Sequence, residues 1–72
     1  MKPRNFAIID GQIVGTGRDE GIRWILRTKG NRSLFQWERG KQAGLRSCAK
    51  IKNLDDAMEW VSKCIRHVEE TA

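Results

Sequence analysis

Hydrophobic and polar residues alternate through the middle of the chain with the period of two that is typical of a half-buried β-strand. In Ile22–Thr28 one face holds Ile22, Trp24, Leu26 and Thr28, and the other face holds Arg23, Ile25 and Arg27. In Ser33–Glu38, Phe35 and Trp37 lie on one face. Because the polar residues Lys29–Arg32 separate these runs, the pattern predicts a β-hairpin.

A third alternating run, Leu45–Ile51, follows a predicted loop at Gly40–Gly44. Combining the three runs divides the predicted sheet into two faces, as expected for an antiparallel sheet with one face in water. The predicted apolar face holds Trp24, Leu26, Phe35, Trp37, Leu45, Ala49 and Ile51. The predicted basic face holds Arg23, Arg27, Arg46 and Lys50.

The N-terminal part is less regular and leaves two interpretations open. Phe6–Ile9 and Gln12–Val14 flank Asp10-Gly11, a dipeptide suited to a two-residue hairpin turn. The alternative is one irregular strand with a bulge at Gly11. The following segment, Gly15–Gly21, consists of glycine and polar residues and is predicted to be a flexible loop. Its Gly-Thr-Gly sequence lacks a strand-to-helix context and therefore does not indicate a phosphate-binding loop.

The period changes to that of a helix after Asn53. This residue is a good N-cap, and Asp55 and Asp56 follow in the first turn, where the helix dipole favours negative charge. One apolar stripe recurs at helical spacing: Leu54, Ala57, Met58, Val61, Cys64, Ile65 and Val68. The stripe predicts a helix that packs on the apolar face of the sheet.

These elements predict an α+β fold with a three- or four-stranded antiparallel sheet and one C-terminal helix packed on one face. The 72 residues form a single domain. Its predicted parts are a frayed leader at 1–5, the sheet at 6–52 and the helix at 53–69.

Charge is distributed unevenly over this fold. Residues 1–52 carry twelve Lys/Arg against four Asp/Glu, whereas residues 53–72 carry two against five. Basic side chains clustered on one face are typical of nucleic-acid-binding proteins. The candidate nucleic-acid-binding residues are Arg23, Arg27, Lys29, Arg32, Arg39, Lys41, Arg46 and Lys50. Ile25 and Leu34 lie on the same predicted face and are candidates for apolar contacts with thymine methyls or a protein.

Other classes of function lack the necessary residues. Cys48, Cys64 and His67 offer at most three zinc ligands where structural sites use four, so we expect no metal and no cofactor. With one histidine and no convergent carboxylates, we expect no enzyme. The longest apolar run, Phe6–Ile9, cannot span a bilayer, and no signal peptide is apparent, so the expected location is the cytoplasm.

The segment from Gly21 to Val61 resembles the DNA-binding domains that consist of a three-stranded sheet and a helix. These are the arm-binding domains of tyrosine recombinases and the AP2/ERF domains of plants. The resemblance rests on Trp24, the Lys29-Gly30-Asn31 turn, Phe35 with Trp37, and Leu54-Asp55-Asp56-Ala57 at the start of the helix. It implies a sheet docked in the major groove, with base contacts from Arg23, Arg27 and Arg46.

The sequence therefore favours a small non-enzymatic module that binds nucleic acid, with duplex DNA preferred to RNA, as in an accessory protein of a phage or mobile element. RNA binding is less favoured because Trp24, Phe35 and Trp37 are expected in the core rather than exposed for base stacking. The alternative is a phage-type inhibitor or adaptor, similar in role to anti-CRISPR proteins, that blocks a protein complex handling nucleic acid. No membrane and no small-molecule substrate is expected.

Overall fold

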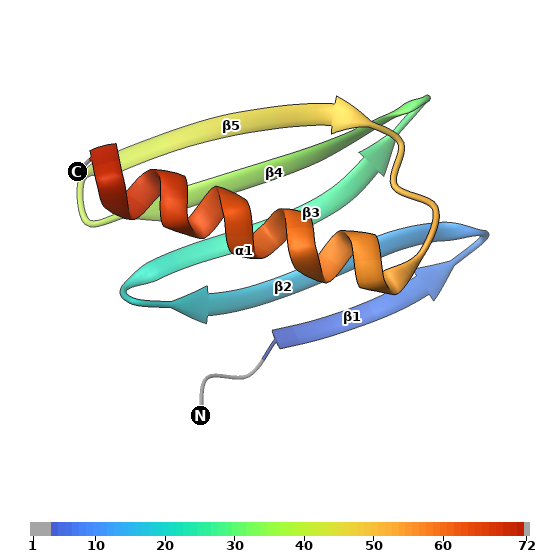
Figure 1. Cartoon of the computed structure of the whole chain (residues 1–72), viewed down its shortest axis with the longest axis horizontal. Helices are drawn as coiled ribbons and strands as arrows, with labels where there is room; N and C mark the ends of the chain where they lie inside the picture. Colours follow the sequence, from blue (N-terminus) through green and yellow to red (C-terminus); the bar gives the residue numbers. More distant parts are fainter. Residues whose placement is uncertain (1–3, 72) are drawn as a thin grey trace.

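The computed structural model describes residues 4–71, which form one five-stranded antiparallel sheet and one helix. The strands lie in the sheet in chain order, so the sheet is a simple meander (Figure 1). The elements are β1 (Arg4–Ile9), β2 (Gln12–Asp19), β3 (Ile22–Lys29), β4 (Arg32–Arg39), β5 (Gln42–Ala49) and α1 (Leu54–Thr71). The α+β class and the C-terminal helix on one face are confirmed, and the sheet has five strands where the sequence predicted three or four.

Four two-residue turns at ten-residue spacing produce the meander. They are Asp10-Gly11, Glu20-Gly21, Gly30-Asn31 and Gly40-Lys41. Both residues have positive φ in the first two turns, as type I′ requires, whereas in the last two only the glycine does, as in type II′. These turn types follow the natural twist of a hairpin, so each turn leads the chain directly back along the preceding strand.

The short turns correct two of the predicted loops. Gly15–Gly21 is not a loop, because β2 continues through Gly15 and Gly17 to Asp19. Gly40–Gly44 is not a loop either, because β5 begins at Gln42. The ambiguity at Phe6–Val14 is resolved as a hairpin, with Ile9 opposite Gln12. Of the predicted leader, residues 4 and 5 belong to β1, and residues 1–3 lie outside the described part.

The turn lengths also decide which side chains share a face. In β5 the two-residue turn pairs Trp37 with Gly44 and Phe35 with Arg46. Leu45 and Ala49 therefore lie on the face opposite to the aromatic residues, and their predicted place in the apolar face is wrong. A register difference of one residue exchanges the faces of a whole strand, which explains why every β5 assignment failed together.

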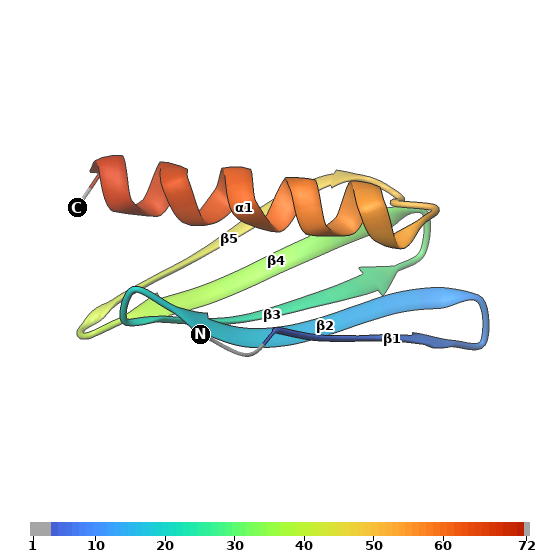
Figure 2. The ribbon, with the colours of Figure 1, turned by 60° about the horizontal axis from the view of Figure 1, so that its bottom comes forward.

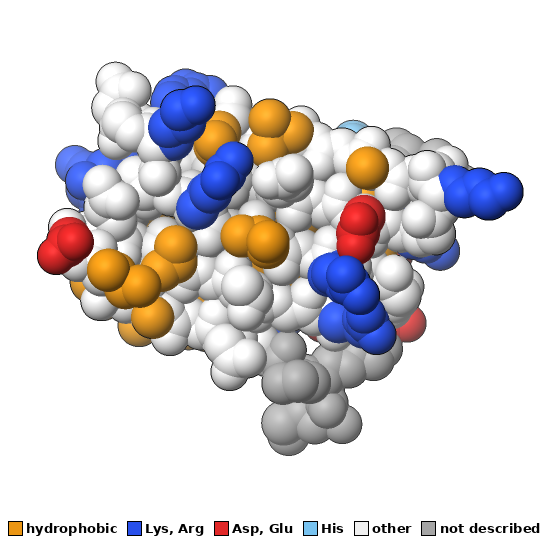
Figure 3. All heavy atoms as spheres, turned by 180° about the vertical axis from the view of Figure 1, so that it is seen from behind, with side chains coloured by type: hydrophobic (Ala, Val, Ile, Leu, Met, Phe, Trp, Pro, Cys, Tyr) orange, Lys and Arg blue, Asp and Glu red, His pale blue; other side chains and the backbone are white. Residues whose placement is uncertain are grey.

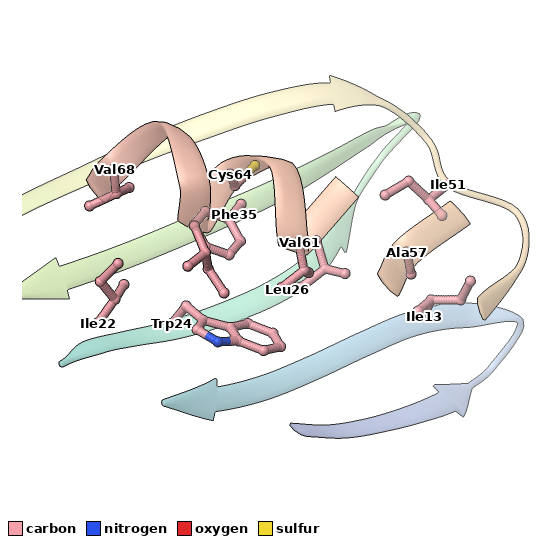
Figure 4. Close-up of a cluster of buried hydrophobic side chains, with 11 residues drawn as sticks. Ile13, Ile22, Trp24, Leu26, Phe35, Ile51, Ala57, Val61, Cys64 and Val68 are labelled. Carbon is pink, nitrogen blue, oxygen red and sulfur yellow. The ribbon is translucent and has the colours of Figure 1, made fainter. Parts of the chain in front are cut away.

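Helix α1 lies across one face of the sheet, which we call the covered face (Figure 2). Between them lies the core, in which Trp24 and Phe35 are stacked at 5.8 Å between ring centroids (Figure 4). The buried hydrophobic residues are Ile13, Ile22, Trp24, Leu26, Phe35, Ile51, Ala57, Val61, Cys64, Ile65 and Val68. The predicted helix stripe is confirmed except near its start, where Leu54 and Met58 are exposed.

Three glycines within strands make room for aromatic rings on the covered face. A Cβ atom on Gly17 would lie 2.6 Å from Cζ2 of Trp24, and one on Gly44 would lie 2.7 Å from the indole of Trp37. At Gly15 the ring of Phe6 approaches to 2.8 Å in the same way. These distances are far below van der Waals contact, so the rings lie flat on bare backbone and the helix can approach the sheet closely.

A polar network joins the first three strands to the helix at one end of the core. Asp19 accepts a hydrogen bond from Nε1 of Trp24 at 3.0 Å and forms an ion pair with Nε of Arg4 at 3.1 Å. Arg4 also donates from Nη1 to Oγ of Ser62 on α1 at 3.0 Å. The network satisfies the buried indole N–H and fixes the position of β1 against the helix.

The start of α1 agrees with the sequence prediction. Oδ1 of Asn53 accepts a hydrogen bond from the backbone N–H of Asp56 at 2.8 Å, which is the bond of an N-cap. The link from β5 to this cap is also held, since the backbone N–H of Ile51 donates to Oγ of Ser33 at 3.0 Å. Ile51 is therefore buried although it lies beyond the end of the strand.

Candidate nucleic-acid interface

The face of the sheet away from α1, which we call the open face, is not covered by any part of the chain that the structure describes (Figures 2 and 3). The strand register places five exposed basic side chains on this face, all on the three central strands. They are Arg18 on β2, Arg23, Arg27 and Lys29 on β3, and Arg32 on β4. Among the described strand residues, the only carboxylate on this face is Glu38.

Arg18 and Arg23 form a first basic cluster at one end of the open face. They are directly opposite each other on β2 and β3, an arrangement of like charges that is unfavourable for the sheet by itself. Glu38 lies opposite Arg23 on the other side, and its Oε1 is 3.2 Å from Nη1 of Arg23. Both side chains are more than half exposed, so this ion pair neutralises only part of the cluster and adds little stability.

The surface around the first basic cluster is hollowed. A shallow depression of about 310 Å³ is lined by Arg18, Gly21, Arg23, Glu38 and Gly40. A second depression of about 290 Å³ adjoins it and reaches Ile25 and Gln36. Guanidinium groups at the wall of a depression are well placed to donate paired hydrogen bonds to a phosphate.

Arg27, Lys29 and Arg32 form a second basic cluster toward the other end of the same strands. Lys29 and Arg32 are opposite each other across the β3–β4 hairpin. Nη2 of Arg32 donates a hydrogen bond to Oγ of Ser47 on β5 at 3.0 Å, which holds this guanidinium down on the open face. The second basic cluster therefore combines one positioned arginine with two cations that extend into solvent.

Two exposed aliphatic side chains lie between the basic clusters, on a face where hydrophobic groups are scattered (Figure 3). Ile25 on β3 and Leu45 on β5 both lie next to Gln36 on β4, and they are 46% and 60% exposed. All aromatic side chains of the described strands lie on the covered face, as the register of Phe6, Trp24, Phe35 and Trp37 requires. The open face therefore offers cations and aliphatic groups but no aromatic platform for base stacking.

The predicted site residues divide between the two faces. Arg23, Arg27, Lys29 and Arg32 are together on the open face, as predicted for the first two. Arg46 was predicted on the basic face, and this placement is wrong because the register puts it on the covered face. Arg39, a candidate expected on a flanking loop, is the last residue of β4; it also lies on the covered face, and its Nη1 is buried. Lys41 lies in the last turn, and Lys50 follows β5, where its backbone N–H donates to the carbonyl of Asn31.

Arg18 is the member of the face that sequence reasoning missed, because its segment was interpreted as a loop. The missed signal is the ten-residue spacing of the turn dipeptides. Taking Glu20-Gly21 as a two-residue turn pairs Arg18 with Arg23 at once.

The remaining chemical groups do not form a second site. Within residues 4–71 no three His, Cys, Asp or Glu side chains are grouped so that they could hold a metal ion. Burial raises the pKa of the Cys64 thiol to about 11, an effect that the nearby charge of Arg46 opposes. Such a thiol is protonated at neutral pH and is a poor nucleophile. No helix of the described chain is long and apolar enough to cross a membrane.

Comparisons with known proteins add no relative to this picture. No family model, no curated protein and no solved structure matches the chain. The resemblance to the DNA-binding domains with a three-stranded sheet and a helix therefore stays a prediction, and the argument for function rests on the open face itself.

Proposed function

We propose that the protein is a small non-enzymatic module that binds the phosphate backbone of nucleic acid on its open face, with duplex DNA as the preferred ligand. The observation that carries the proposal is the charge of that face: its described strand residues include five exposed cations and one carboxylate, all on β2, β3 and β4. A concentrated positive surface attracts polyanions through phosphate neutralisation and counterion release.

The spacing of the basic clusters favours a duplex. Arg23 and Arg27 are four residues apart on β3, so their Cα atoms are separated by about 13 Å at ~3.3 Å per residue. The major groove of B-DNA is about 12 Å wide, so the two clusters match the separation of the phosphate strands that border it. Ile25, between them, faces the groove in this arrangement.

The length of the strands limits how the face meets DNA. In this arrangement the strands run across the groove, and the eight residues of β3 span about 26 Å at ~3.3 Å per residue, which is wider than the major groove. The face therefore lies across the backbones instead of entering the groove in full, and most contacts go to phosphates. Phosphate contacts position a protein but carry no sequence information directly, so we expect weak sequence preference.

A salt titration of binding tests the proposal. Fluorescence anisotropy with labelled duplex DNA, single-stranded DNA and RNA of equal length measures the dissociation constant at several salt concentrations. Neutralisation of about four phosphates predicts a slope near −3.6 in log K against log salt for the duplex. Equal affinity for all three ligands would remove the preference for duplex DNA, and absence of binding at low salt would contradict the proposal.

Single-residue variants locate the surface. Arg18→Ala and Arg27→Ala should each weaken duplex binding and reduce the salt slope by about one. Arg66→Ala is the matched control, because Arg66 is an exposed arginine on α1. Arg46→Ala separates the two faces of the sheet and should also leave the slope unchanged. An Arg66→Ala effect as large as that of Arg27→Ala would show that net charge, and not the open face, controls binding.

The exposed aliphatic side chains of Ile25 and Leu45 favour one alternative, a protein inhibitor or adaptor that contacts a nucleic-acid-handling complex. Exposed aliphatic side chains bordered by arginine are typical of protein interfaces as well as of DNA contacts. A stoichiometric protein partner in a pull-down, lost on Leu45→Lys, together with no mobility shift of any nucleic acid, would support this alternative over the main proposal.

A further inference from the structure

Strand β1 forms an exposed edge of the sheet. Its register with β2 is continuous from Arg4 to Ile9, without a bulge, and the five residues from Asn5 to Ile9 carry no charge and no proline. Natural proteins commonly protect such edges with lysine, proline, bulges or a covering segment. We propose that β1 pairs antiparallel with β1 of a second copy of this chain, forming a two-fold symmetric dimer with a continuous ten-stranded sheet.

The backbone groups of β1 that point away from β2 define how a second strand can pair with it. Because Asp10-Gly11 is a two-residue type I′ turn, Ile9 and Gln12 exchange backbone hydrogen bonds, and so does every second pair along the hairpin. The backbone groups of Phe6 and Ile8 therefore point away from β2. A two-fold axis at Ala7 places Phe6 opposite Ile8 of the second copy, so that both unpaired sets of donors and acceptors are satisfied.

The side chains of the edge complement themselves in this register. Ile8 and Ile9 are 61% and 58% exposed, on opposite faces of β1. Next to the edge, a shallow and largely apolar depression of about 200 Å³ is lined by Asn5, Phe6, Ala7, Val14, Gly15 and Thr16. The two-fold axis places Ile9 of one copy opposite Asn5 of the other, at the border of this depression. Each copy thus supplies one projecting isoleucine and one depression.

Charge favours a second copy at this edge. The chain carries a net charge of +5, so two copies repel each other at most surfaces. The five cations of the open face are on β2, β3 and β4 and are absent from β1. The proposed register places Arg4 of one copy opposite Asp10 of the other at each end of the ladder, so no like charges meet there, while the guanidinium of Arg4 keeps its bonds to Asp19 and Ser62 of its own chain. The neutral edge is thus where two copies approach at lowest electrostatic cost.

The symmetry gives the dimer a simple shape. An axis perpendicular to the sheet keeps both helices on one side and joins the two open faces on the other. Within the described residues the sheet of each copy has one edge with an uncharged centre, β1, because the other edge strand, β5, carries Arg46 at its centre. The pairing therefore closes with two copies and does not continue into a fibre. The inference stands whether or not the open face binds nucleic acid.

Sedimentation equilibrium tests the dimer in the absence of any nucleic acid. An interface of one strand pair and two isoleucines per copy is small, so we expect a dissociation constant of the order of 100 µM. Ile9→Lys should raise this constant by about tenfold or more, because a charge enters each depression. Leu45→Lys is the matched control, since Leu45 is equally exposed, lies on the other edge strand and gains the same charge.

Cross-linking tests the register. Ala7 of the two copies would form a non-hydrogen-bonded pair with Cα atoms about 4.5 Å apart, within the range for a disulfide. Ala7→Cys should therefore oxidise rapidly to a covalent dimer, whereas Ala43→Cys, on the open face of β5, should not. Three results would each overturn the proposal. The first is a protein that stays monomeric at millimolar concentration, and the second is an Ile9→Lys variant that dimerises as well as Leu45→Lys. The third is equal cross-linking of the two cysteine variants.

Discussion

The substitution Gly17→Ala tests whether the aromatic rings of the core depend on bare backbone. A Cβ atom at position 17 would lie 2.6 Å from Cζ2 and 2.8 Å from Cε2 of Trp24, whereas carbon atoms in contact are about 3.5–4.0 Å apart. The indole would have to retreat by about 1 Å. Gly17 does not have positive φ, so the backbone itself accepts alanine and the destabilising part of the effect is steric.

The surroundings of Trp24 determine the size of this effect. The side chain is 1% exposed, its Nε1 donates to Asp19 at 3.0 Å, and its ring packs on Phe35 and Phe6. Overpacking of a tight core costs about 1–3 kcal/mol. The reduced entropy of the unfolded chain returns about 0.5–1 kcal/mol. We expect a net loss of about 1–2 kcal/mol, a large share of the ~4–11 kcal/mol typical of a domain this size.

Urea unfolding followed by tryptophan fluorescence measures this loss, and near-UV circular dichroism reports the indole environment. Gly44→Ala is the first comparison: its contact with Trp37 is equally close at 2.7 Å, but Trp37 is only half-buried and can shift, so the loss should be smaller. Gly11→Ala is the second. It has φ of 74° and no atom within 4 Å, so it should cost about 1–2 kcal/mol through backbone strain and leave the near-UV spectrum unchanged.

The reasoning would be refuted by a Gly17→Ala protein with the unfolding midpoint and near-UV spectrum of the wild type. A loss equal to that of Gly44→Ala would refute a narrower point, namely that burial of the ring, and not the contact distance, controls the cost.

Two further predictions concern the polar network and the buried thiol. Asp19→Asn should lower the free energy of unfolding by about 1–2 kcal/mol in urea titrations, because Arg4 loses its partly buried partner. Glu38→Gln removes the exposed partner of Arg23 and should cost at most about 0.5 kcal/mol. Equal losses for the two variants would contradict this prediction. The free energy of unfolding should also fall as the pH rises from 9.0 to about 11, because the Cys64 thiol loses its proton at lower pH in the unfolded chain than in the folded one. A Cys64→Ala protein, compared over the same pH range, should lack this part of the decrease.

Local patterns were sufficient for most of the secondary structure. The alternation in β3 and β4 and the helical stripe of α1 were correctly interpreted, because each follows one period over several residues with large apolar side chains. The segments Gly15–Gly21 and Gly40–Gly44 were misinterpreted for a common reason. Glycine usually weakens a strand, and nothing local shows that Gly17 and Gly44 lie beneath an indole ring contributed by a neighbouring strand.

The candidate site was predicted only in part. Arg23 and Arg27 were placed correctly because they alternate with buried residues on their own strand. Arg18 was missed with its segment, and Arg46 was assigned to the wrong face because β5 has few large side chains to indicate its orientation. Leu45 and Ala49 of the same strand were predicted to be core residues, yet both are exposed.

The amino-acid sequence by itself determined the class of the fold, the helix and its cap, and the excess of basic charge before residue 53. The tertiary structure decided which of those charges share a surface. The physical reason is that side chains on a strand alternate between faces, so the face of each residue depends on the length of every turn before it. Four two-residue turns set that alternation, and they bring Arg18, Arg23, Arg27, Lys29 and Arg32 together while placing Arg39 and Arg46 on the other side.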